Sequence, residues 1–313
     1  MKKTIKVIDE ERGIIQCTSL DERWYSVPSK DPNTGLPTYE YYPSSSWIAG
    51  YYHKGKGFEN YLKQHGEDAD MILIEAGLRG SHVHQAVEMI IAGEVIESDT
   101  PIFNGQTGKE EELTTDEWEV IKTFVDWNNE MKPTYLLSER TVISKKYKYG
   151  GTLDAVVKIG EKTYLIDFKT SKAIYPSHRI QLASYKEALM EEKPKADGIN
   201  LAILQIGYRL NKKGWKFTEI EDKFDLFLNT YAIWKEENPN SKPRQIDLPI
   251  KLGISNPLVI KKVETPEPKI DPGEPQLVAD PIDDTRPKKT AQKSKSEAKQ
   301  PNKLTKPHAT KGI

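Results

Sequence analysis

The chain of 313 residues has a single cysteine, Cys17, and lacks any apolar run of the roughly 18 residues that a membrane-spanning helix needs. One thiol excludes a disulfide framework, a four-cysteine zinc site and a four-cysteine iron–sulfur cluster within one chain. Acidic residues (Asp9, Glu10 and Glu11) follow the first apolar residues, unlike in a signal peptide. We therefore expect no membrane association and a reducing, cytoplasmic location.

An excess of either charge is also missing, since 46 Lys and Arg stand against 47 Asp and Glu. The balance hides an asymmetry, because 263–284 is acidic, 285–313 is basic, and no aromatic residue follows Trp234. A segment of this kind buries too little apolar surface to offset its chain entropy. We expect 1–262 to form one folded domain and 263–313 to be a disordered tail that binds DNA, docks a protein partner or solvates the chain.

The first half of the chain predicts a hairpin, a loop and several helices. Alternating strands are expected at 4–8 and 14–18. The tyrosine-rich stretch 26–42 contains several turn residues and is predicted to be a loop. Helical periodicity then predicts four helices, at 58–64, 69–76, 81–92 and 115–131.

After residue 134 the apolar period changes to two, which is typical of strands. Strands are expected at 135–143, 152–159 and 162–168, with Gly160 and Glu161 as a tight turn between the last two. A helix at 177–192, strands at 199–208 and 215–220, and a helix at 223–237 follow. The sequence therefore predicts an α/β fold with a mixed sheet.

Asp154 and Asp167 stand between apolar neighbours of the predicted strands, and Lys169 directly follows the last of these strands, at positions where Val or Ile would be usual. Buried charges cost stability unless they are paired or bound to a metal. Because side chains alternate along a strand, Asp167 and Lys169 share one face and Phe168 points to the other. A solvated strand face with a Lys–Asp pair is the alternative interpretation.

Counting outward from the Gly160–Glu161 turn places Lys158 opposite Thr163 and Asp154 opposite Asp167. Two opposed carboxylates repel each other, and a divalent cation between them reverses the sign of that interaction. Oxygen ligands of this kind suit Mg²⁺ or Mn²⁺. A lysine beside such an ion would orient or help deprotonate an attacking water, or stabilise charge on a phosphate.

Four motifs in a fixed order carry a family resemblance: the segment 79–88 with His84, Gly151-Thr152-Leu153-Asp154, Asp167-Phe168-Lys169, and Gln181-Leu182-Ala183-Ser184-Tyr185. Gln181 and Tyr185 are four residues apart and so share a helix face. Together the motifs resemble the PD-(D/E)XK nuclease superfamily, specifically its RecB-like exonuclease branch. Segments 42–48 and 54–57 look like the N-terminal part of phage and mitochondrial members.

The resemblance implies a restriction-endonuclease-like core, in which a central mixed sheet is flanked by helices. It makes His84, Asp154, Asp167 and the backbone carbonyl of Phe168 ligands of Mg²⁺ or Mn²⁺, and Lys169 the catalytic lysine. Asp154 and Asp167 act in catalysis as well, and Gln181 and Tyr185 support the site and contact DNA. Many relatives have Glu at the position of Asp167.

The cysteines that hold an iron–sulfur cluster in some relatives are missing, so the cluster-free branch, with phage exonucleases and the mitochondrial genome maintenance exonuclease, is the closer match. The resemblance implies a DNA exonuclease, a hydrolase of phosphodiesters, in DNA replication, recombination or repair, in a host cytoplasm if phage-encoded. Single-stranded DNA or duplex ends are the expected substrates. The alternatives are a structure-specific endonuclease and a non-cleaving nucleic-acid-binding or recombination accessory protein.

Several other residues receive no role at this stage. His82 is two residues from His84 and faces elsewhere on the helix. Glu88 either reaches the site or forms a salt bridge, and Glu139 is assigned nothing. The segment 105–109 contains two glycines and a lysine but lacks the Walker spacing, so no phosphate loop is expected.

Overall fold

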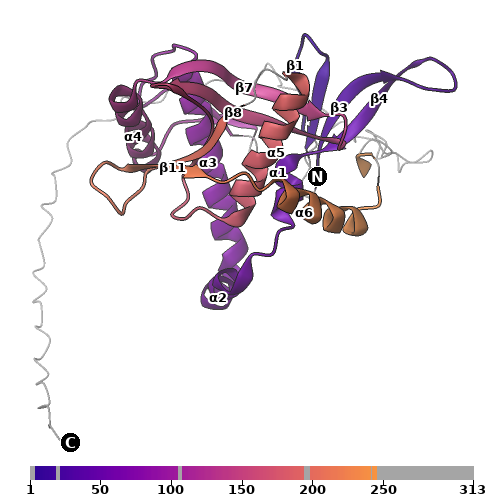
Figure 1. Ribbon diagram of the computed structural model, residues 1–313. Helices are drawn as coiled ribbons and strands as arrows, with labels where there is room; N and C mark the ends of the chain where they lie inside the picture. Colours follow the sequence, from indigo (N-terminus) through magenta and orange to yellow (C-terminus); the bar gives the residue numbers. More distant parts are fainter. Residues whose placement is uncertain (1–3, 19–21, 105–107, 194–197, 241, 245–313) are drawn as a thin grey trace, which may run out of the picture. The chain divides into compact units, whose positions relative to one another are not determined.

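The computed structural model describes residues 4–18, 22–104, 108–193, 198–240 and 242–244 (Figure 1). The chain divides into the units Met1–Leu252 and Gly253–Ile313, and the second lies entirely outside the described residues. The predicted boundary at residue 262 and the predicted tail 263–313 lie there as well, so both stay predictions.

A five-stranded sheet forms the centre of the first unit, in the order β11-β10-β9-β8-β7. Strands β9 and β10 are parallel, and the other neighbours are antiparallel. The parallel pair is joined by the crossover helix α5, as this geometry requires. The α/β class with a mixed sheet is confirmed. The elements are β7 (Thr134–Ser144), β8 (Tyr149–Ile159), β9 (Lys162–Lys169), α5 (Pro176–Glu192), β10 (Asn200–Ile206) and β11 (Trp215–Ile220).

Helices cover both faces of this sheet (Figure 1). Leu165 of β9 packs on one face with α5, α1 (Ser45–Gly50) and α6 (Phe224–Glu237). Its neighbours Ile166 and Phe168 pack on the other face with α3 (Ala69–Ile91) and α4 (Thr115–Met131). The central strands are therefore buried on both sides, which explains why charged residues in them stand out against an apolar background.

A second, antiparallel sheet is built from β1 (Thr4–Asp9), β2 (Ile14–Thr18), β3 (Arg23–Lys30) and β4 (Pro37–Pro43). The predicted N-terminal hairpin is confirmed as β1 and β2. The prediction of a loop over 26–42 was wrong for most of its length, because residues 25–30 of β3 pair with residues 37–42 of β4 and only 31–36 form the turn between them. Residues 32–40 are all exposed, so this part of the hairpin has no buried face to impose an apolar alternation.

The α2 helix (Gly55–His65), a short 3₁₀ turn (Gly66–Asp68) and α3 follow α1. The two helices expected at 69–76 and 81–92 are one continuous helix, because the glycines between them, Gly77 and Gly80, do not end α3. The helix expected at 115–131 is confirmed as α4, with a capping box formed by Thr114 and Glu117. No described helix has the length and apolarity to cross a bilayer.

A small hairpin of β5 (Ile102–Asn104) and β6 (Lys109–Glu111) precedes α4. Residues 105–107 of the glycine-containing segment lie outside the described part of the chain. The sequence did not predict this hairpin, whose strands are only three residues each.

The N-terminal sheet contacts β8 through Tyr25 of β3. The hydroxyl of Tyr25 lies 3.2 Å from Thr152 Oγ1, and a β-carbon at Gly150 would lie 2.8 Å from the Tyr25 ring. Arg12 binds Glu192 at the end of α5 at 2.8 Å and also donates to the carbonyl of Thr141 in β7. The Tyr25 contacts hold β8, which carries Asp154, and the Arg12 contacts hold the neighbouring β7 and α5.

Gly151 generates the first testable prediction, because a β-carbon there would lie 2.2 Å from Cε1 of the buried Tyr185. We expect Gly151→Ala to lower the free energy of unfolding by about 1–3 kcal/mol through overpacking, measured by urea denaturation. Gly77→Ala is the control, since nothing lies within 4 Å of that added carbon and alanine favours a helix by about 1 kcal/mol. Equal stability of the Gly151→Ala variant and the wild type would contradict this packing.

Candidate active site

The predicted catalytic residues come together where the pairing of β8 with β9 ends, beside α3. Asp167 is 1% exposed and Asp154 is 9% exposed. Lys169 Nζ lies 2.6 Å from Asp167 Oδ2, and His84 Nδ1 lies 3.7 Å from Asp154 Oδ2. The β8–β9 hairpin and the distant helix α3 thus supply one cluster of two carboxylates, an ammonium group and an imidazole.

The turn at Gly160 sets the relative position of the two carboxylates. Lys158 pairs with Thr163, as predicted, and the regular ladder ends at Ala155 and Ile166. Asp154 and Asp167 occupy the next positions. At these positions a side-chain hydrogen bond replaces the backbone pairing, because Asp154 Oδ2 accepts a hydrogen bond from the backbone N–H of Phe168 at 2.7 Å.

The side chains of β9 alternate as the sequence predicted. The Phe168 ring lies on the face opposite Asp167, with centroids 5.5 Å from the Phe124 ring and 6.3 Å from the His84 ring. This packing anchors the strand on one face and leaves the carboxylate and the lysine on the other. His82 points away from the site and lies 3.0 Å from Glu117.

Electrostatics couple Asp167 and Lys169. Burial raises the pKa of Asp167, and the negative charge of Asp154 raises it further, against the opposing effect of Lys169. Burial lowers the pKa of Lys169, but the two carboxylates outweigh that effect and the net pKa is raised. Lys169 is therefore an ammonium group at neutral pH. The Lys169 ammonium group lies close to the buried oxygen Asp167 Oδ2. Among the described residues, however, no donor has the geometry of a hydrogen bond to that oxygen.

The helix α5 presents the last predicted motif. Gln181 Nε2 donates to the hydroxyl of Tyr185 at 2.8 Å, and the Tyr185 ring packs against Gly151, three residues before Asp154. Burial raises the pKa of Tyr185 well above its usual value. In this structure the pair supports β8 from the α5 side of the sheet.

Two residues near the site received no role from the sequence. Glu139 of β7 lies across from Asp154 by register, in a left-handed backbone conformation with φ of 46°. Burial raises its pKa to about 9, with further contributions from Asp154 and Glu88. Counting the β7–β8 pairs outward would have found this position. The second missed residue is His178 in the first turn of α5, for which no motif gave a signal.

The donor set fits a hard divalent cation in its chemistry. It offers the His84 imidazole and the carboxylates of Asp154 and Asp167, and the buried Oδ2 of Asp167 has no aligned hydrogen-bond donor among the described residues. The side chains are not gathered as a finished ligand cage, since no group of three or more His, Cys, Asp or Glu among the described residues has that arrangement. The cation beside Asp167 in this structure is the ammonium group of Lys169.

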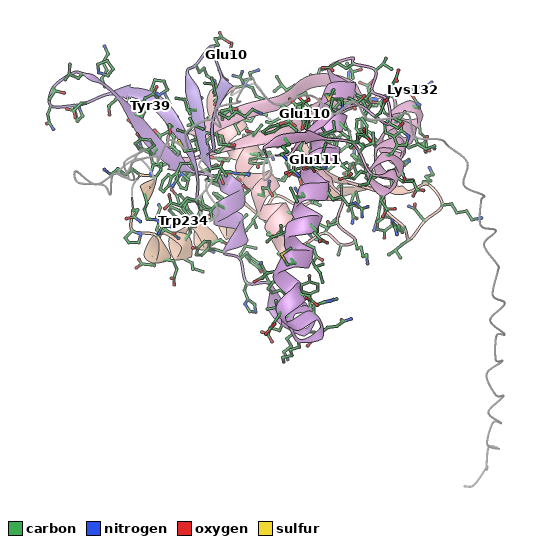
Figure 2. The ribbon with its side chains drawn as sticks, turned by 180° about the vertical axis from the view of Figure 1, so that it is seen from behind. Glu10, Tyr39, Glu110, Glu111, Lys132 and Trp234 are labelled. Carbon is green, nitrogen blue, oxygen red and sulfur yellow. The ribbon has the colours of Figure 1, made fainter. Side chains whose placement is uncertain are left out.

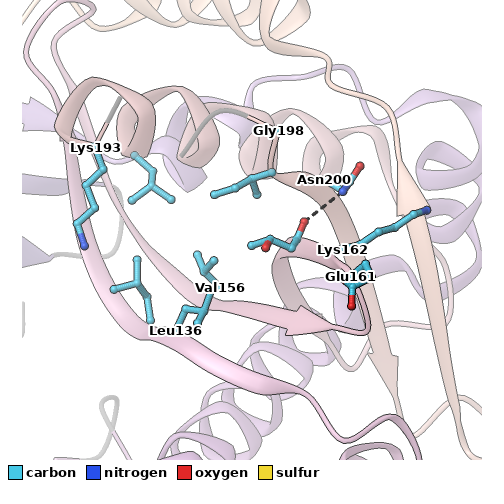
Figure 3. A pocket seen from close by; sticks show the side chains of 11 residues that line it. Leu136, Val156, Glu161, Lys162, Lys193, Gly198 and Asn200 are labelled. Carbon is cyan, nitrogen blue, oxygen red and sulfur yellow. Dashed lines mark hydrogen bonds between the residues drawn. The ribbon is translucent and has the colours of Figure 1, made fainter. Parts of the chain in front are cut away.

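A described cavity lies elsewhere, beside the turn that joins β8 and β9 (Figure 3). It has a volume of about 540 Å³ and a mixed apolar and polar lining that includes Leu136, Val156, Lys162 and Lys193. Asn200 at its edge donates to the carbonyl of Thr163 at 3.2 Å. None of the candidate site residues lines this cavity, so it does not bear on the chemistry at Asp167.

Comparisons with known proteins leave the family open. No family model and no curated protein matches this chain. Among solved structures, the chain is similar to one described as the crystal structure of SSO0001, with 14% sequence identity and a TM-score of 0.27. That match covers 64% of this chain and 100% of the other. A similarity at this level carries no argument about function.

Glu139 generates a prediction about stability and pH in metal-free buffer with EDTA. Its pKa is about 9 in the folded state against 4.5 for the free group, so between these values the folded state holds a proton that the unfolded state has released. Stability should therefore fall as pH rises from about 5 to 9. We expect Glu139→Gln to flatten this slope by up to about 1.4 kcal/mol per pH unit, measured by urea denaturation at several pH values. Glu161→Gln, at an exposed turn carboxylate, is the control, and parallel slopes for the wild type and Glu139→Gln would count against the assignment.

Proposed function

We propose that the protein is a metal-dependent DNA nuclease, an exonuclease with a PD-(D/E)XK core. The observation that carries the proposal is the placement of two buried carboxylates on adjacent strands, just past the last β8–β9 pair, with a lysine 2.6 Å from one and a histidine 3.7 Å from the other. This is the arrangement that the four sequence motifs imply. Buried charges of this kind cost folding free energy unless they are paired, hydrogen-bonded or bound to a metal.

The chemistry of each side chain indicates its role in this proposal. His84, Asp154, Asp167 and the carbonyl of Phe168 would hold Mg²⁺ or Mn²⁺, which when bound activates water and stabilises charge on a phosphoryl oxygen. Lys169 keeps its proton, because the neighbouring carboxylates raise its pKa. Its role is therefore to orient the attacking water and to stabilise negative charge on the scissile phosphate, in preference to acting as a base.

The remaining elements position these groups. The hydrogen bond from Phe168 to Asp154 fixes one carboxylate relative to the strand of the other, and Tyr185 packs behind the Gly151 backbone. A preorganised site of this kind fixes its charges before substrate arrives. The resemblance further supports a role in replication, recombination or repair of DNA, in the cytoplasm of a cell or of a phage-infected host.

The proposal predicts that the wild type cleaves labelled DNA in the presence of Mg²⁺ or Mn²⁺ and is inactive in EDTA. Lys169→Ala and Asp167→Asn should each lower the cleavage rate by about 100- to 1,000-fold, because each removes a charge that acts on the reacting phosphate. Lys162→Ala, at an exposed lysine of the same strand, is the matched control and should cleave like the wild type. Undiminished cleavage by both site variants would contradict the proposal.

End-blocked substrates separate exonuclease from endonuclease in the same assay. An exonuclease loses activity on a single strand blocked at the end from which it starts, whereas an endonuclease continues to cut. Comparing 5′- and 3′-blocked strands also fixes the direction. If the wild type cleaves a strand blocked at both ends as fast as an unblocked strand, the protein is an endonuclease and the exonuclease proposal is wrong.

Calorimetric titration with Mn²⁺ tests the metal site without DNA. We expect the wild type to bind Mn²⁺ and Asp167→Asn to lose at least about tenfold in affinity, since a ligand is removed. Asp225→Asn, at an exposed carboxylate of α6, should bind like the wild type. Absence of Mn²⁺ binding by the wild type would favour the non-cleaving accessory protein.

A further inference from the structure

An aromatic pair stands at the start of α5, close to the candidate active site. Tyr175 immediately precedes the helix and is 51% exposed, although it is a large apolar ring. Its centroid lies 5.2 Å from that of His178, with the rings edge to face at 81°. An exposed aromatic ring does little for the core, so its exposure needs another explanation.

Backbone contacts fix the orientation of the pair. The His178 N–H donates to the Tyr175 carbonyl at 3.1 Å, and the Tyr175 N–H donates to His178 Nδ1 at 3.4 Å. Since Nδ1 accepts a hydrogen bond, the proton of the neutral ring lies on Nε2. Burial and the charge of Lys169 lower the pKa of His178 to about 4, so the ring is neutral at neutral pH and Nε2 is a donor.

The pair borders the catalytic cluster. The charges of Lys169 and Asp167 both act on His178, and Gln181 follows one helical turn later. The loop from Lys169 to Tyr175 is pinned, because Gln205 Nε2 donates to the Ser171 carbonyl at 2.9 Å. The position of the rings relative to Asp167 and Lys169 is therefore set by the fold.

We propose that Tyr175 and His178 bind the unpaired nucleobase next to the scissile phosphate, with Tyr175 stacking on the base and His178 Nε2–H donating to an oxygen of the same nucleotide. This inference rests on the proposed function and deepens it, because it assigns two residues to contact an unpaired base of single-stranded DNA or of a frayed duplex end. A base inside a duplex has both faces covered by its neighbours, whereas an unpaired base offers a face to an exposed ring.

Tyr175 and the neutral His178 carry no charge, so their contact with a base can be distinguished from the binding of phosphates. Exposed basic residues nearby, such as Lys172 and Arg179, would contact phosphates and release counterions, so their contribution depends on salt. Stacking releases no counterions, and every base has an aromatic face. The pair should therefore add affinity that is independent of salt and of base identity.

The test measures binding of single-stranded oligonucleotides in EDTA by fluorescence anisotropy over a range of salt concentrations. We expect Tyr175→Ala to weaken binding by about 5- to 100-fold, the range for loss of one stacked base, with an unchanged salt slope. Tyr175→Trp should bind like the wild type. Tyr39→Ala is the matched control, because Tyr39 is 41% exposed on the β3–β4 hairpin (Figure 2) and touches none of the site residues described here.

Oligonucleotides with a single abasic position locate the contact. At one position the difference between the wild type and Tyr175→Ala should disappear, because the base that Tyr175 stacks on is missing. An altered fold would not depend on one base. Wild-type affinity of Tyr175→Ala, a loss that is equal for every abasic oligonucleotide, or a changed salt slope would each overturn the inference.

The failure of this inference is distinguishable from failure of the proposed function. A wild type that neither binds nor cleaves DNA overturns both. A wild type that cleaves DNA, combined with a Tyr175→Ala variant that binds every oligonucleotide as tightly, overturns the stacking contact alone.

Discussion

The carboxylate of Asp154 accepts the backbone N–H of Phe168 at 2.7 Å, at the point where the regular pairing of β8 and β9 ends. Most of the candidate site depends on this contact. The contact orients one oxygen of Asp154 toward β9 and keeps Asp154 within reach of His84 on α3. Asp167 and Lys169 then lie on the face of β9 opposite Phe168. A residue without a side-chain acceptor here would leave a buried N–H unsatisfied, at a cost of about 1–3 kcal/mol.

Much of the central fold was predictable because its apolar pattern is imposed by burial. The strands β8 and β9 have two covered faces, and the Gly160 turn fixes their register, so counting residues sufficed. The exposed hairpin β3–β4 was missed because no core dictates its pattern. The single helix α3 was divided in the prediction because Gly77 and Gly80 resemble helix ends in sequence, although nothing in the structure terminates the helix there.

The candidate site was predictable as a set of residues and less so as an arrangement. The motifs indicated His84, Asp154, Asp167 and Lys169, and the structure brings these four together. The contact of Asp154 with a backbone amide could not be read from the sequence, because it depends on where the ladder stops. The same holds for His178, whose proximity to Lys169 depends on the path of the loop before α5.

The crossover of α5 between β9 and β10 has a consequence for how the chain acquires its chemistry. Parallel neighbours pair only after the intervening helix has packed across the sheet, and contacts of long sequence separation form slowly. The groups of the site come from α3, β8, β9 and α5, so no early hairpin or isolated helix contains a complete set. Nascent or partly folded chains therefore lack the assembled cluster, and its formation during refolding reports closure of the crossover rather than formation of secondary structure.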